Sequence, residues 1–144
     1  MKNSAHIPRP VIQQDPTGCA IACAAVLTGL TYARVRNVAA ELGIDLGDPA
    51  LWTSPSPMRA LLARLELKIS PRETPFKSWQ ALPDRALLAI KWHIERGVPH
   101  WHWTVFVRNG EGACVLDSKK ALKSHRRTDF GRMHPKWFIE VCNP

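Results

Sequence analysis

The chain has 144 residues, of which 45% are hydrophobic and 22% are charged, and its formal net charge is +8 at pH 7. This length suits one domain, residues 1–144, that buries a sizeable hydrophobic core. No apolar run approaches the roughly 18 residues that span a bilayer, so we expect a soluble protein that does not contact a membrane.

Residues 1–12 form an extended lead-in with two prolines, Pro8 and Pro10. Met1 to Pro10 lacks the apolar stretch of a secretory signal. We therefore expect a cytoplasmic protein, or one that is exported without a classical signal peptide.

The segment Gln13–Gly29 predicts a turn followed by a buried helix that begins at Cys19. Asp15, Pro16 and Gly18 are turn residues, and the run after Cys19 is almost entirely alanine and aliphatic until Gly29. The positive end of the helix dipole favours a thiolate at Cys19, and the free N–H groups of the first turn can face an oxyanion. Gln13 lies six residues earlier, and its amide is a candidate second oxyanion donor.

The other three cysteines, Cys23, Cys114 and Cys142, lack the close pairing of a zinc ribbon or a disulfide framework. We expect structural free thiols at these positions. A disulfide between Cys114 and Cys142 is the alternative.

Two further helices are predicted in the N-terminal half. Residues 32–42 carry apolar side chains at helical spacing, with Thr31 as the N-cap and Gly43 as the stop. Residues 44–57 form a loop around Trp52 that either contributes to a substrate cleft or is pinned to the core. Ser56 then caps a third helix, with Pro57 at its first position.

The C-terminal half has the pattern of an antiparallel sheet. Strands are predicted at Leu67 and Ile69 and at residues 85–92, 100–107, 113–117 and 137–141. The apolar stretch Ala86–Ile90 is typical of a central strand, and Gly97-Val98-Pro99 separates it from the next one. The whole chain is therefore predicted to be α+β, with N-terminal helices packed on a C-terminal antiparallel sheet.

One hairpin of this sheet brings a base and an orienting carboxylate together. A turn centred between Gly110 and Glu111 pairs Thr104 with Asp117, and alternation then places His102 and Asp117 on one face as diagonal neighbours. A cysteine nucleophile needs such an imidazole and a group to orient it. His100 shares that face and is the rival base, but it lies farther from the partner of Asp117.

Gln13, five intervening residues and Cys19 at the start of a buried helix resemble the nucleophile segment of papain-like cysteine peptidases. The similarity is greatest to the bacterial double-glycine leader peptidases and their stand-alone relatives. Their histidine opens a short hydrophobic strand, as at His102, and an aspartate follows aliphatic residues about fifteen positions later, as at Asp117. The resemblance implies a papain-like fold, a Cys-His-Asp triad and an oxyanion hole formed by Gln13 and the Cys19 N–H.

The chain departs from the family pattern at two positions beside the triad. The family usually has glycine after the cysteine and proline after the aspartate, where this chain has Ala20 and Ser118. Neither change removes a catalytic atom, although Ala20 is expected to alter the cleft beside the nucleophile.

Some of these residues would also suit a zinc site, and a basic segment could serve as a binding surface. His100, His102 and Cys19 are suitable zinc ligands, with Asp117 behind them, but that arrangement leaves Gln13 without a role.

A basic segment is interpreted as a solvated surface, and it consists of Lys119, Lys120, Lys123, Arg126 and Arg127. Nucleic acid is an unlikely partner because no aromatic-interleaved binding motif or zinc finger accompanies the segment. The remaining histidines, His6, His93, His125 and His134, are expected on the surface or in loops.

The sequence therefore predicts a cysteine peptidase that cleaves an amide bond of a protein or peptide substrate through a thioester, without a cofactor or metal. Side-chain deamidation and transglutaminase-type acyl transfer use the same intermediate and stay open as alternatives. A non-catalytic basic binding module on the same fold is the alternative from another class. The oligomeric state and the need for an activating partner are not predicted.

Overall fold

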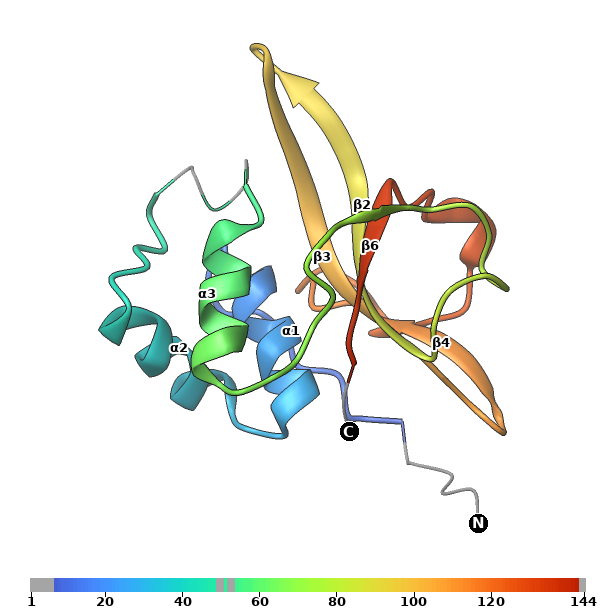
Figure 1. Cartoon of the computed structure of the whole chain (residues 1–144), viewed down its shortest axis with the longest axis horizontal. Coiled ribbons are helices and arrows are strands. Elements are labelled where there is room, and N and C mark those ends of the chain that lie inside the picture. The colour runs from blue at the N-terminus through green and yellow to red at the C-terminus, as the bar shows by residue number, and fades with distance from the viewer. Residues whose placement is uncertain (1–6, 49–50, 52–53, 143–144) are drawn as a thin grey trace.

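The computed structural model describes residues 7–48, 51 and 54–142. It has an α+β architecture in which helices lie beside an antiparallel sheet (Figure 1). The described residues form three α-helices, α1 (Cys19–Thr28), α2 (Tyr32–Glu41) and α3 (Ser56–Arg64). The predicted loop residue Trp52 lies outside the described residues.

The helix ends follow from their capping residues. Gly29 adopts a left-handed conformation, with φ of 78°, and ends α1 as predicted. Thr31 caps α2 by accepting a hydrogen bond from the Arg34 N–H at 3.1 Å, which also confirms the prediction. The prediction for α3 was one residue off, because Pro55 occupies the N-cap position and Ser56 is the first helical residue.

The sheet contains six strands within the described residues, in the order β1-β6-β2-β3-β4-β5, and every pairing is antiparallel. Their bounds are β1 (Thr74–Pro75), β2 (Arg85–Glu95), β3 (Val98–Asn109), β4 (Gly112–Leu116), β5 (Arg126–Arg127) and β6 (Trp137–Glu140). A short 3-10 helix, η2 (Phe130–Arg132), precedes β6. The predicted strand at Leu67 and Ile69 was wrong, because that segment contributes only an isolated bridge between Ile69 and Val141.

Each face of the sheet has its own hydrophobic core. One face carries Trp101, Trp103 and Val105, which pack with the buried side of α1 and the other helices. Phe106 and Val115 belong to the opposite face, where they pack with Leu82 and Met133. This alternation along β3 follows from the two-residue period of a strand.

The β2–β3 hairpin extends beyond the rest of the molecule (Figure 1). Gly97-Val98-Pro99 was expected to lie outside the strands, but β3 begins at Val98 and Pro99 pairs with Ile94. Pro99 is tolerated because β4 pairs with β3 only from Val105 onward, so the other side of β3 needs no hydrogen-bond donor there. Both strands are consequently longer than predicted.

No single helix in the described part of the chain is long and apolar enough to cross a membrane. Only α1 and α2 taken together pass that test of length and composition, and they are bent by 115° at the break between them.

Candidate active site

Cys19 is the first residue of α1 and is half-buried. The turn before it is held by Asp15, whose carboxylate accepts a hydrogen bond from the Tyr32 hydroxyl at 2.6 Å and pairs with Arg36 at 3.1 Å. Burial and this hydrogen bond raise the pKa of Tyr32 to about 12, so its hydroxyl stays protonated as a donor. The turn and α2 thus fix the start of the helix that carries the cysteine.

His102 and Asp117 form a direct pair. The His102 Nε2 lies 2.8 Å from the Asp117 Oδ1, and the two side chains are 13% and 0% exposed. Val105 pairs with Leu116 and Asn109 with Gly112, so the hairpin is centred between Gly110 and Glu111 as predicted. The register is confirmed, and it explains why His102 on β3 meets Asp117, which directly follows β4.

Asp117 is surrounded by hydrogen-bond donors. Its Oδ1 also accepts from the backbone N–H of Lys119 at 3.0 Å, and its Oδ2 accepts from the Arg127 Nη1 at 3.0 Å. Burial alone would raise the pKa of Asp117, but the bonds from His102, Lys119 and Arg127 hold it well below its usual value. The carboxylate is therefore ionised and can only accept, so His102 donates from Nε2.

The surroundings of His102 favour its charged form. Burial lowers the pKa of His102, but its hydrogen bonds to Asp117 and to the Cys19 sulfur, and the attraction of these two groups, outweigh this effect and raise it to about 9. Because Nε2 is bonded to Asp117, the ring nitrogen that faces Cys19 is Nδ1. The imidazole therefore stands between a carboxylate and a thiol, which is the order that a nucleophile–base–orienter triad requires.

Gln13 is connected to this triad through Ser118. The Ser118 hydroxyl donates to the Gln13 Oε1 at 2.8 Å, and the Gln13 backbone N–H donates to the Ser118 carbonyl at 3.0 Å. The Gln13 Nε2 donates to the carbonyls of Asp15 and Pro16, at 3.1 and 3.2 Å. Serine after the aspartate thus provides a side-chain hydrogen bond that a proline at this position cannot make.

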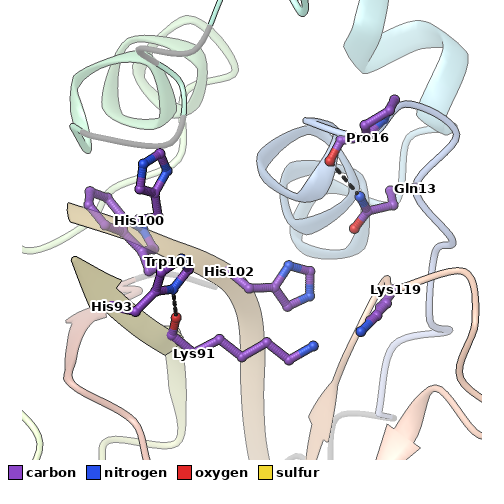
Figure 2. A pocket seen from close by; sticks show the side chains of 8 residues that line it. All are labelled: Gln13, Pro16, Lys91, His93, His100, Trp101, His102 and Lys119. Carbon is purple, nitrogen blue, oxygen red and sulfur yellow. Dashed lines mark hydrogen bonds between the residues drawn. The ribbon is translucent and has the colours of Figure 1, made fainter. Parts of the chain in front are cut away.

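A cleft of about 230 Å³ opens beside His102 and is lined by Gln13, Pro16, Lys91, His93, His100, Trp101, His102 and Lys119. Figure 2 shows the His102 ring pointing from its strand toward Gln13 and Lys119. The rival base His100 lies farther along β3, where its ring stacks on His93 at 5.5 Å and its Nε2 is 3.9 Å from Glu95. Ala20 is not among the residues that line this cleft and packs instead against the main core.

The basic segment is not uniformly a solvated surface, so that interpretation was wrong in part. The Arg127 side chain is only 14% exposed and bridges Asp117 to Asp129. His125 was also expected to be a simple loop residue, yet its Nδ1 lies 2.8 Å from the Asp117 carbonyl. Charge clustering along the sequence could not reveal either role, because β5 is two residues long and has no detectable periodicity.

The alternative zinc site is not assembled among the described residues. Within residues 7–48, 51 and 54–142, no three His, Cys, Asp or Glu side chains are arranged to hold a metal ion. His102 is bonded to Asp117 instead, and His100 lies beside His93 and Glu95. All four cysteines are free thiols, and Cys114 is buried whereas Cys142 is exposed, so the alternative disulfide is not formed.

Gly18 is required by the close approach of Tyr32 to the turn. A Cβ added at Gly18 would overlap the Tyr32 hydroxyl and lie 3.1 Å from the Asp15 carbonyl oxygen. We expect Gly18→Ala to lower the free energy of unfolding by about 2 kcal/mol, or the melting temperature by about 6 °C, because Tyr32 must move away from Asp15. Thermal unfolding followed by circular dichroism measures this loss.

Two further variants make that test specific. Gly131→Ala is the matched control, since a Cβ at Gly131 meets nothing within 4 Å. The double variant Gly18→Ala/Tyr32→Phe lacks the overlapping hydroxyl and should regain part of the loss. Equal melting temperatures for Gly18→Ala and Gly131→Ala would show that the turn does not depend on this contact.

No family model matches the chain, and no curated protein is significantly similar to it.

Proposed function

We propose that the protein is a cysteine-dependent amide hydrolase, a peptidase of the papain-like type. The observation that carries the proposal is the position of His102, whose Nε2 is bonded to Asp117 at 2.8 Å while its other ring nitrogen faces Cys19. The α+β architecture supports a papain-like fold, because its first helix begins with the cysteine and the sheet carries the histidine on β3, with the aspartate directly after β4.

The reaction would begin from a Cys19 thiolate paired with the His102 imidazolium, which holds the Cys19 proton on Nδ1. The thiolate attacks the carbonyl carbon of an amide, and a C–S bond forms as the carbonyl π-electrons move to oxygen. Asp117 stabilises the imidazolium, because its ionised carboxylate accepts the Nε2–H throughout.

The oxyanion of the tetrahedral intermediate needs hydrogen-bond donors on the side of α1. The Cys19 N–H belongs to the first helical turn, whose N–H groups have no partner within the helix. The Gln13 NH2 is the second donor in this proposal. Its hydrogens point to the carbonyls of Asp15 and Pro16, so it has to share or exchange one of these bonds when the oxyanion forms.

The tetrahedral intermediate then collapses and leaves an acyl-enzyme. The C–N bond breaks as the Nδ1–H of His102 protonates the departing amine, which leaves a thioester on Cys19. His102 next takes a proton from water, and the resulting hydroxide attacks the thioester. The C–S bond breaks and releases a carboxylic acid and the Cys19 thiolate, which is again paired with the His102 imidazolium. With a glutamine side-chain amide as substrate, attack by water on the thioester would give deamidation, and attack by an amine would give transglutamination.

The pH dependence of Cys19 alkylation by iodoacetamide tests the proposal directly. Cys142 is exposed and serves as the reference thiol within the same molecule. We expect Cys19 at pH 6 to react at least about tenfold faster than Cys142, because the His102 imidazolium stabilises the reactive thiolate. Mass spectrometry of the digested protein measures both rates in one sample.

Two variants assign the effect to one histidine. His102→Ala should remove the advantage of Cys19 at pH 6, whereas His100→Ala should keep it. If Cys19 reacts like Cys142 in the wild type and in both variants, the catalytic proposal fails. A reactive Cys19 then justifies a search in a peptide library for cleaved bonds, deamidated glutamines and incorporated amines.

A further inference from the structure

The cleft beside His102 contains no negative charge to balance its positive charges. Its charged or titratable lining residues are Lys91, Lys119 and three histidines, and no Asp or Glu lines it among the described residues. Lys91 and Lys119 both have exposed side chains. Neither forms an ion pair with another residue in the part of the chain that the structure describes.

The nearby carboxylates are already occupied. Asp117 accepts hydrogen bonds from His102, Lys119 N–H and Arg127, so its oxygens are not left for an ammonium group. Glu95 lies 3.9 Å from both His93 and His100, which supplies those two imidazoles with a neighbouring charge. The uncompensated charge of the cleft is therefore concentrated on Lys91 and Lys119.

The backbone directs Lys91 toward this position. Lys91 has a positive φ of 57° and lies at the register shift of the β2–β3 hairpin, between Ile90 and His93. Such bulges reorient side chains, and a strained non-glycine residue is a common feature of functional sites. Figure 2 shows the Lys91 side chain extending past His102 toward Lys119. Burial lowers the pKa of Lys91, and the like charge of the adjacent Lys119 lowers it further.

We propose that Lys91 and Lys119 form a carboxylate-binding subsite that holds an Asp or Glu side chain of the substrate next to the amide attacked by Cys19. The inference rests on the proposed function and adds a substrate class, peptides with an acidic residue beside the cleaved bond. Two ammonium groups around a cleft of about 230 Å³ suit a single carboxylate. A nucleic-acid strand would need an exposed stacking surface, whereas the lining aromatic residue Trp101 is 5% exposed.

A matched pair of alkylating reagents tests the subsite without knowledge of the natural substrate. N-chloroacetyl-aspartate α-amide and N-chloroacetyl-asparagine α-amide differ only in the charge of one side chain. In both, the Cys19 sulfur forms a bond to the CH2 carbon and chloride leaves with the C–Cl electrons. We expect the aspartate reagent to alkylate Cys19 about fivefold faster at low salt, an advantage that shrinks in 0.5 M NaCl.

Charge variants connect the preference to the two lysines. Lys91→Gln/Lys119→Gln should reduce the aspartate-to-asparagine ratio to about one, and Lys91→Glu/Lys119→Glu should reverse it. Lys120→Gln/Lys123→Gln is the matched control, since it also removes two positive charges but from residues that do not line the cleft. Lys91→Asn/Lys119→Gln is an independent second double variant, because asparagine tolerates the left-handed backbone at residue 91.

The possible results separate this inference from the proposed function. If Cys19 reacts no faster than Cys142 with any reagent, the catalytic proposal and the subsite both fail. If Cys19 is reactive but the ratio is the same in the wild type and in the double glutamine variant, only the subsite is wrong. Cys19 could also react faster with N-chloroacetylglycine than with N-chloroacetylglycinamide, yet equally fast with the aspartate and asparagine reagents. This result would show that the subsite binds a terminal carboxylate and not an acidic side chain, which would overturn the proposal. Protection of Cys19 by single-stranded DNA, but not by an acidic peptide, would overturn it in favour of nucleic acid.

Discussion

Asp117→Asn is expected to lower the rate of acyl transfer by about 10³-fold and the free energy of unfolding by about 3 kcal/mol. The Asp117 side chain is 0% exposed and accepts three hydrogen bonds, from His102, the Lys119 N–H and Arg127. Asparagine has one accepting oxygen and one NH2 group. Whichever way the amide is turned, its NH2 faces a donor, either Arg127 or the pair of His102 and Lys119 N–H.

The two losses have different causes and are measured separately. The rate falls because an imidazole that faces an NH2 group adopts the wrong tautomer to accept the Cys19 proton, and alkylation or peptide cleavage at pH 7 reports it. The stability falls because His102 and Arg127 lose a buried counter-charge, and the melting temperature should drop by about 10 °C. The pKa of Asp117 is depressed in the folded protein, so its contribution is present above about pH 4 and disappears as the pH falls through the folded-state value.

A second substitution makes this prediction specific to Arg127. In Asp117→Asn/Arg127→Gln, the glutamine oxygen can accept from the asparagine NH2, which leaves the asparagine oxygen for His102. The double variant should therefore be more active than Asp117→Asn alone. Wild-type activity in Asp117→Asn would contradict the role assigned to Asp117. If the double variant is no more active than Asp117→Asn, the role assigned to Arg127 is contradicted.

The contact between His102 and Asp117 could be predicted because it depends on two local signals. The polar and glycine residues at 109–112 define the hairpin turn, and the period of two along each strand then determines which side chains share a face. The start of α1 at Cys19 was predictable for a similar reason, since turn residues precede a run of alanine and aliphatic residues. Both features arise from the chemistry of adjacent residues.

The remainder of the site depends on contacts between segments far apart in the sequence. Arg127 reaches Asp117 from a two-residue strand that has no pattern of its own, and in the sequence it is only one of several clustered basic residues. Ser118 was identified as a departure from the family pattern, but its bond to Gln13 spans 105 residues. Lys91 reaches the cleft through a register shift that the continuous strand pattern of residues 85–92 does not reveal.

Titration of His102 should make the wild-type protein less stable at alkaline pH. The pKa of His102 rises from the ordinary value of 6.5 to about 9 in the folded protein, a difference worth about 3 kcal/mol. Since the folded value is raised, this stabilisation is fully present below pH 6.5 and is lost as the pH rises through about 9. We expect the melting temperature to fall by about 10 °C between pH 6 and pH 10 from this group alone. Thermal unfolding at closely spaced pH values measures the loss.

The variant His102→Gln should lack the stabilisation from the charged imidazole at every pH. It should also lower the rate of acyl transfer by about 10⁴-fold, because glutamine cannot accept the Cys19 proton. His134→Asn is the matched control, since His134 is exposed and its positive φ of 45° suits asparagine. Cys19→Ala removes one of the two partners that raise the pKa of His102, so the alkaline loss should begin at a lower pH. Parallel stability curves for wild type and His102→Gln between pH 6 and pH 10 would mean that the imidazole is not held as a cation. The thiolate–imidazolium pair on which the proposed reaction depends would then have no basis.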